Sequence, residues 1–111
     1  MKFSKENMHC KKDMKGFEVW ELQDRAKFPI DGAIVKIENG VFPLKINHGF
    51  YALFYIIKGS LELEVEGKVE VLNGGDFYIL EPELRHRMRA DYAEMIEVCH
   101  PPFDVKNVEI S

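Results

Sequence analysis

The sequence predicts a single all-β domain. Its 111 residues are the length of one domain, and 46% of them are hydrophobic, a composition typical of globular proteins. From Ala33 onward, apolar residues recur with a period of two and turn residues recur about every eight to twelve positions, as in sandwiches and barrels. We therefore expect residues 17–111 to form a β-barrel domain. Residues 1–16 are polar without periodicity, which predicts a flexible N-terminal segment.

The first strands differ in how clearly the sequence defines them. Residues 17–22 (FEVWEL) fit either an edge strand or a short helix, and the pattern does not separate the two. Residues 50–57 (FYALFYII) are apolar on both faces of a strand. One face would cover the core and the other a second sheet or subunit, so this segment favours a homodimer.

A hairpin is expected over residues 60–72, where Leu and Val alternate with Glu, with Gly67 and Lys68 as its two-residue turn. Further strands are expected over residues 76–80, 85–89 and 93–99. Arginine occupies every second position of 85–89. These arginines either hold an anionic ligand or pair with the alternating glutamates of the hairpin, and pairing is the more ordinary outcome.

Charge and cysteine content exclude several functional classes. The net charge of −4 argues against general binding to nucleic acid or to anionic membranes. The two cysteines, Cys10 and Cys99, are too few and too far apart in sequence to suggest a disulfide framework. No secretory signal or long apolar run is visible. We therefore expect a soluble cytoplasmic protein with no nucleic-acid or membrane partner.

Two segments resemble the motifs of the small single-domain cupins. INHGFYALFYIIKG places His48 at the second histidine of the first cupin motif and Gly59 at its glycine. GDFYILEPELRH carries the glycine, aspartate, proline and histidine of the second motif at family spacing, ending at His86. The resemblance covers about residues 33–103. It implies a cupin-type double-stranded β-helix, or jelly-roll, barrel in one domain.

The departures from the family pattern concern its metal site. The first histidine of the family pair falls at Ile46, and the metal-binding glutamate falls at Ala52. Of the four ligands that the resemblance implies, only His48 and His86 are present. The resemblance therefore implies an eroded metal site and identifies the fold better than the chemistry.

Strand periodicity predicts a pocket around the two histidines. If His48 faces the barrel interior, residues at even positions of the same strand face it too, provided that no bulge intervenes. His86 shares a face with Met88 in the same way. The predicted ligand pocket, mostly apolar and suited to a small molecule, is lined by Ile46, His48, Ala52, Phe54, His86 and Met88.

Three functions compete on these grounds. The first is binding of a small molecule in an apolar pocket around His48 and His86. The alternative is a metal-dependent cupin enzyme, of oxygenase or isomerase type, which uses the two histidines with Glu97 or His100 as a substitute ligand. One divalent transition metal (Fe, Mn, Ni or Zn) is then the expected cofactor, and otherwise none. A third is a metal-free isomerase or epimerase with an acid and a base in the pocket. The sequence leaves open whether the protein is an enzyme, and it identifies no catalytic residue.

Overall fold

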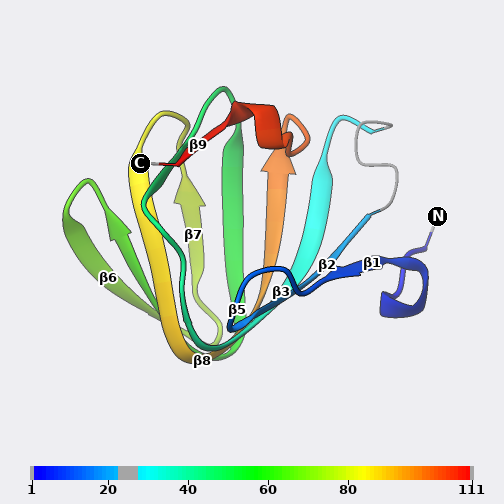
Figure 1. The fold of residues 1–111 in the computed structure, drawn as a ribbon, viewed down its shortest axis with the longest axis horizontal. Helices are drawn as coiled ribbons and strands as arrows, with labels where there is room; N and C mark the ends of the chain where they lie inside the picture. The colour runs from blue at the N-terminus through cyan, green and yellow to red at the C-terminus, as the bar shows by residue number, and fades with distance from the viewer. Residues whose placement is uncertain (1, 23–27, 111) are drawn as a thin grey trace.

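The structure, a computed structural model, describes residues 2–22 and 28–110. Within these ranges, nine strands form one sheet that curls on itself, and the helical elements are short 3-10 turns at Lys5–Asn7 and Val105–Asn107 (Figure 1). The all-β jelly-roll prediction is confirmed. The strands are β1 (His9–Lys11), β2 (Phe17–Glu21), β3 (Asp31–Val41), β4 (Lys45–Asn47), β5 (Tyr51–Val65), β6 (Lys68–Asn73), β7 (Phe77–Leu80), β8 (Arg85–His100) and β9 (Val108–Ile110).

Three long strands carry the architecture. β5 and β8 each bend near the bottom of the molecule in Figure 1, so that each runs through both walls of the curled sheet, whereas β3 runs down one wall and ends at the bend. β8 lies between β3 and β5 and pairs antiparallel with both. β2 and β1 extend the sheet from β3, whereas β4 and β9 extend it from the first half of β8. The segments predicted separately over 85–89 and 93–99 are therefore one continuous bent strand.

At each bend the strand changes which residues face inward. In β8 the buried residues are even-numbered up to Ala90 and odd-numbered from Ala93 onward. In β5 the register with β8 shifts around Gly59, which has a φ of +83°. A Cβ on this glycine would lie 2.2 Å from the carbonyl oxygen of Tyr92. Only glycine permits this conformation and this close approach.

The core fills the concave side of the sheet. Its fully buried members include Ile37, Phe54, Ile56, Leu61 and Met95. They come from the inward positions of the three long strands, with Phe50 and Leu80 closing the space between them. Burial of this apolar surface is the main stabilising contribution to the fold.

The predicted hairpin is present with its turn displaced by one residue. β5 ends at Val65, which pairs with Lys68, so the turn residues are Glu66 and Gly67. Both have positive φ, of +49° and +82°, as a type I′ turn requires. The prediction of Gly67 and Lys68 as the turn was wrong because a Gly-X turn and an X-Gly turn fit the same alternation.

The predicted pairing of the arginine and glutamate rows is confirmed on the outer surface. Arg87 lies 3.2 Å from Glu64, and Arg89 lies 3.5 Å from Glu62. Both pairs are directly opposite in the β5–β8 register. Because these side chains are partly exposed to solvent, each pair contributes about 0.2–1 kcal/mol at most.

The N-terminal region adds to the sheet. β1 pairs with β2, and β2 pairs with β3, which settles residues 17–21 as strand. The segment 1–16, expected to be flexible, thus contributes a paired strand, while its mobility stays a prediction. In the described part of the chain, no helix is long and apolar enough to cross a membrane.

The convex face of the sheet is apolar where β7, β5 and β8 lie side by side. Leu53 of β5 pairs with Ile79 on one side and Val98 on the other. Tyr55 pairs in the same way with Phe77 and Ile96. Phe77 and Ile79 are 66% and 63% exposed. FYALFYII therefore has one face in the core, as expected, and its other face lies on the outside of the sheet, where covering by a second subunit stays a prediction.

Candidate ligand cavity

A cavity of about 280 Å³ opens between the two walls of the curled sheet. Its walls come from β2 and β3 on one side and from β4 and β8 on the other, and both terminal segments contribute. Most of the lining is apolar, including Phe17, Val19, Ala33, Val35, Phe42, Met88, Phe103 and Val108. Its ionisable side chains are Lys11, Asp13, Glu21, Asp31, Lys45 and Glu97.

Lys45 brings an amine into this cavity. It lies on β4 opposite His86 of β8, and its Nζ sits 3.9 Å from the centre of the Phe42 ring. Burial is the largest influence on the Lys45 pKa and lowers it, against the opposing effect of the Glu97 carboxylate. Burial away from water disfavours the charged ammonium, so Lys45 gives up its proton more readily than a surface lysine, although the Phe42 ring itself favours the ammonium.

Glu97 and Cys99 lie on the inner face of the second half of β8. Glu97 pairs with Ala33 and Cys99 with Asp31, both on β3. The Cys99 thiol lies 3.5 Å from Oε2 of Glu97. The structure thus gathers an amine, carboxylates and a thiol around one mainly apolar space, an arrangement typical of sites that bind and orient small molecules.

The predicted pocket residues are distributed differently. Of the six, Met88 lines the cavity. Ala52 and Phe54 face inward as expected, but they are fully buried in the core. Ile46 lies half-buried on β4, next to the buried Asn47.

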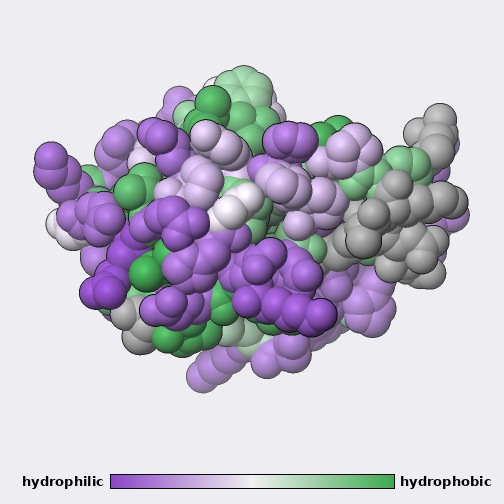
Figure 2. Space-filling view, turned by 90° about the horizontal axis from the view of Figure 1, so that it is seen from above, coloured by the Kyte–Doolittle hydropathy of each residue, from purple (hydrophilic) through white to green (hydrophobic). Residues whose placement is uncertain are grey.

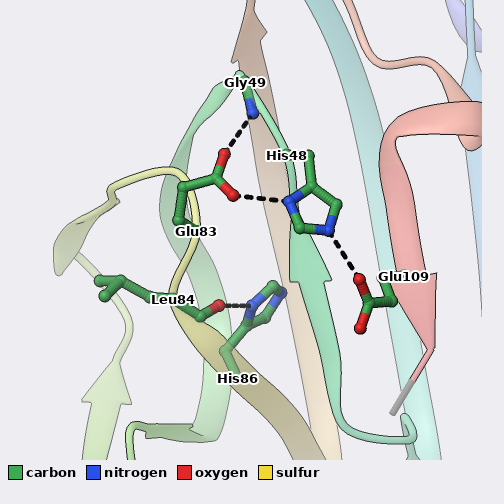
Figure 3. A network of polar contacts seen from close by, with 6 residues as sticks. All are labelled: His48, Gly49, Glu83, Leu84, His86 and Glu109. Carbon is green, nitrogen blue, oxygen red and sulfur yellow. Dashed lines mark hydrogen bonds and ion pairs between the residues drawn. The ribbon is translucent and has the colours of Figure 1, made fainter.

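His48 is not part of the cavity lining. It follows β4 and lies between Glu83 and Glu109 (Figure 3). Its Nδ1 is 2.5 Å from a carboxylate oxygen of Glu83, and its Nε2 is 2.9 Å from one of Glu109. The backbone N–H of Gly49 donates to the second oxygen of Glu83. The hydrogen bonds to these two glutamates raise the pKa of His48, and the bond to His48 lowers that of Glu83. With both ring nitrogens protonated, the imidazolium donates to both carboxylates.

His86 is buried, and it also lies outside the cavity lining. Its Nδ1 lies 3.0 Å from the carbonyl oxygen of Leu84, as Figure 3 shows, which makes Nδ1 the protonated donor. Its Nε2 is buried with no hydrogen-bond partner. Burial is the main influence on the His86 pKa and lowers it. We therefore expect the His86 ring, which lies opposite Lys45 in the β4–β8 register, to be neutral.

The metal hypothesis requires at least three donors around one point. In the ranges that the structure describes, no three His, Cys, Asp or Glu side chains are placed to hold a metal ion. Both His48 nitrogens face carboxylates, and His100 Nδ1 lies 2.8 Å from the carbonyl oxygen of Pro29. Glu97 lies in the cavity lining, away from both histidines' contacts. The donor set does not fit the proposed metal, and we derive no chemistry through one.

The sequence offered little sign of Lys45. It stands between Leu44 and Ile46 in the loop-to-strand segment PLKIN, where a lysine is ordinarily read as a surface residue. The apolar residues on either side of Lys45 are the signal that the sequence offers.

Seen from above, the molecule presents a mostly hydrophilic surface with hydrophobic patches toward its edges (Figure 2).

Comparison with known proteins identifies the family. A model of the cupin domain matches residues 33–100. No curated protein sequence matches the chain. Solved structures do match in fold, with identities so low that only the fold is shared.

Three of these structures illustrate the range of proteins that share the fold. Pac13, a nucleoside dehydratase, is 16% identical with a TM-score of 0.90, covering 100% of this chain and 90% of its own. KdgF from Halomonas sp. is 20% identical with a TM-score of 0.77, covering 94% and 96%. Oxalate decarboxylase from Bacillus subtilis is 20% identical with a TM-score of 0.84, covering 97% of this chain but 31% of its own. With the family match spanning more than half of the sequence and the same barrel in its structure, this chain belongs to the cupin family.

Proposed function

We propose that this protein binds a small, neutral and mainly apolar molecule in the cavity between its two walls. The observation that carries the proposal is the lining itself: aromatic and aliphatic side chains form the body, and Lys45 and Glu97 supply polar groups at fixed positions. Such a combination buries the apolar part of a ligand and orients it through one polar group.

Size and charge narrow the ligand class. A volume of about 280 Å³ is near the lower end for ligand pockets and suits a compact molecule. Lys11 pairs with Glu21 at 3.6 Å. The carboxylates of Asp13 and Glu97 outnumber the amine of Lys45. An anionic ligand would therefore be repelled, and a neutral one is preferred.

The structural neighbours support a small-molecule role without identifying the ligand. Pac13 is described as a nucleoside dehydratase, and Streptomyces Pac13 variants were solved with uridine. These proteins share the barrel with this chain.

A cavity-filling substitution tests the proposal. Binding of benzyl alcohol, a compact neutral probe, is followed by protein NMR in the wild type and in Ala33→Leu, which adds side-chain volume to the lining beside Glu97. We expect wild-type binding that the substitution reduces at least about tenfold. The matched control is Gly32→Ala on the opposite face of β3, where a new Cβ would have its nearest neighbour at 3.9 Å. Absence of wild-type binding, or equal binding by Ala33→Leu, would contradict the proposal.

We also propose that the protein is a homodimer formed through its convex face. The rows centred on Leu53 and Tyr55 present apolar side chains from three adjacent strands. They end at a charged row in which Glu94 of β8 lies between Lys36 and Lys58. A second copy related by a two-fold axis would cover the apolar rows and set charges of opposite sign at the edge. The cytoplasmic location stays a prediction from the sequence.

A further inference from the structure

We propose that Lys45 is a nucleophile that forms a reversible imine with a small aldehyde or ketone held in the cavity. The inference rests on the proposed ligand site and specifies its chemistry. It starts from the position of the Lys45 amine, which lines a mainly apolar cavity and lies against the ring of Phe42.

The surroundings of Lys45 favour a neutral amine. The strand opposite places the buried His86 beside it, and the cavity lining around it is mainly apolar. The contact with the Phe42 ring acts in the other direction, because an aromatic face stabilises the ammonium form. Burial lowers the pKa of Lys45. A desolvated lysine in an apolar pocket is one of the recognised forms of activated amine nucleophile.

The charges of the cavity argue against the simpler role of binding an anion. The carboxylates of Asp13 and Glu97 share the lining with Lys45. A carboxylate or phosphate ligand would have to approach both. A neutral carbonyl compound is not repelled by these carboxylates, and the amine can attack its electrophilic carbon.

Glu97 supplies the proton transfers that the reaction requires. The nitrogen lone pair of neutral Lys45 attacks the carbonyl carbon, and the carbonyl π electrons move to oxygen. The nitrogen gives a proton to the Glu97 carboxylate, and the oxygen takes one from water, which gives a neutral carbinolamine. The Glu97 carboxylic acid formed in this step protonates the carbinolamine hydroxyl group, which leaves as water, and the C=N bond forms as an iminium ion. The remaining N–H proton passes to the Glu97 carboxylate and from there to the hydroxide formed earlier, which gives the imine. Addition of water reverses the sequence, and no oxidant or reductant takes part.

Reductive trapping tests the proposal. The intact protein is treated with benzaldehyde and cyanoborohydride at neutral pH, and modified lysines are located by peptide mass spectrometry. Hydride reduction converts the imine to a stable secondary amine. We expect Lys45 to be modified at least about tenfold faster than the exposed lysines, because a larger fraction of its amine is neutral. Labelling confined to exposed lysines, with Lys45 unmodified, would overturn the proposal.

Variants and competition complete the test. Lys45→Met should remove the fast labelling, whereas Lys68→Met, on an exposed lysine of β6 outside the cavity lining, should keep it. If Lys45→Met fails to fold, benzyl alcohol added to the wild type should slow labelling of Lys45 but not of exposed lysines. Benzyl alcohol binding without fast Lys45 labelling would refute the imine and leave the proposed function standing. Loss of benzyl alcohol binding itself would refute the proposed function.

Discussion

His48 and Glu109 join the end of β4 to the last strand of the chain, with Nε2 of the imidazole 2.9 Å from a carboxylate oxygen. On its other side, His48 binds Glu83 in the loop between β7 and β8. Three chain segments that are distant in sequence therefore meet at one charged imidazole. The contact holds β9 and the adjoining C-terminal segment against the barrel.

This contact should make stability depend on pH in two directions. The pKa of His48 is raised above 6.5, so its contribution is full below that value and is lost as pH rises through the folded-state pKa. The pKa of Glu83 is lowered below 4.5, so its contribution is present above that value and is lost as pH falls through the folded-state pKa. The contact should therefore stabilise the fold most between about pH 4.5 and 6.5.

Urea unfolding of the wild type and His48→Gln across this pH range measures the effect. The difference in unfolding free energy should be greatest in that window and should shrink on either side of it. His9→Gln, at an exposed histidine of β1, serves as the control and should show no such maximum. A pH-independent difference for His48→Gln would contradict the assignment.

Gly59→Ala should destabilise the barrel at its bend. The new Cβ would meet the Tyr92 carbonyl oxygen at 2.2 Å, in addition to the cost of a positive φ. We expect a loss of more than about 2 kcal/mol in unfolding free energy. Gly75→Ala has a similar positive φ with nothing within 4 Å of the new Cβ, so it should lose about 1 kcal/mol. Equal losses would show that the close contact is relieved without cost.

Leu53→Lys should separate the dimer without unfolding the chain. Leu53 lies at the centre of the convex apolar rows, so a charge there would be buried without a partner in the assembled dimer. Light scattering should then report a monomer, with an unchanged circular dichroism spectrum. Val71→Lys on β6, an exposed position outside these rows, is the matched control and should remain dimeric. A wild-type protein that is already monomeric would contradict the proposal.

A chelator should leave stability unchanged. No three donor side chains converge in the parts of the chain that the structure describes, so no bound ion is expected to contribute to folding. Protein purified without nickel should unfold at the same temperature with and without EDTA. A chelator-dependent drop that His86→Ala abolishes would instead support the metal site expected from the cupin motif.

Strand periodicity predicted the faces of residues within a continuous strand. In RHRMRA, burial of His86 and Met88 and exposure of the arginines follow the alternation directly. The arginine and glutamate rows also paired as expected, because opposite charges on neighbouring strands define the register as well as the turn does. Local alternation predicts the face of each residue correctly wherever the strand does not bend.

The same reasoning failed where the chain bends or breaks. The predicted pocket took His48 as facing inward and continued the alternation from it to Ala52 and Phe54, but Gly49 has a φ of +78° and interrupts the alternation. Asn47, and not His48, is the buried residue at the end of β4. The inward position of Glu97 depends on the change of face after Ala90. No local pattern marks these points, since they arise from packing between distant strands.

The strands of the sheet differ in how strongly they are paired. β5 and β8 contribute 15 and 16 residues to extensive ladders, whereas β1 and β9 are three-residue strands at the borders of the sheet. Short terminal ladders open by local unfolding at lower free energy than the central strands. Lys11, Phe103 and Val108 line the cavity on these loosely held segments. Ligand exchange should then follow fraying of the chain ends, so hydrogen exchange at β1 and β9 would report the rate at which the cavity admits and releases its ligand.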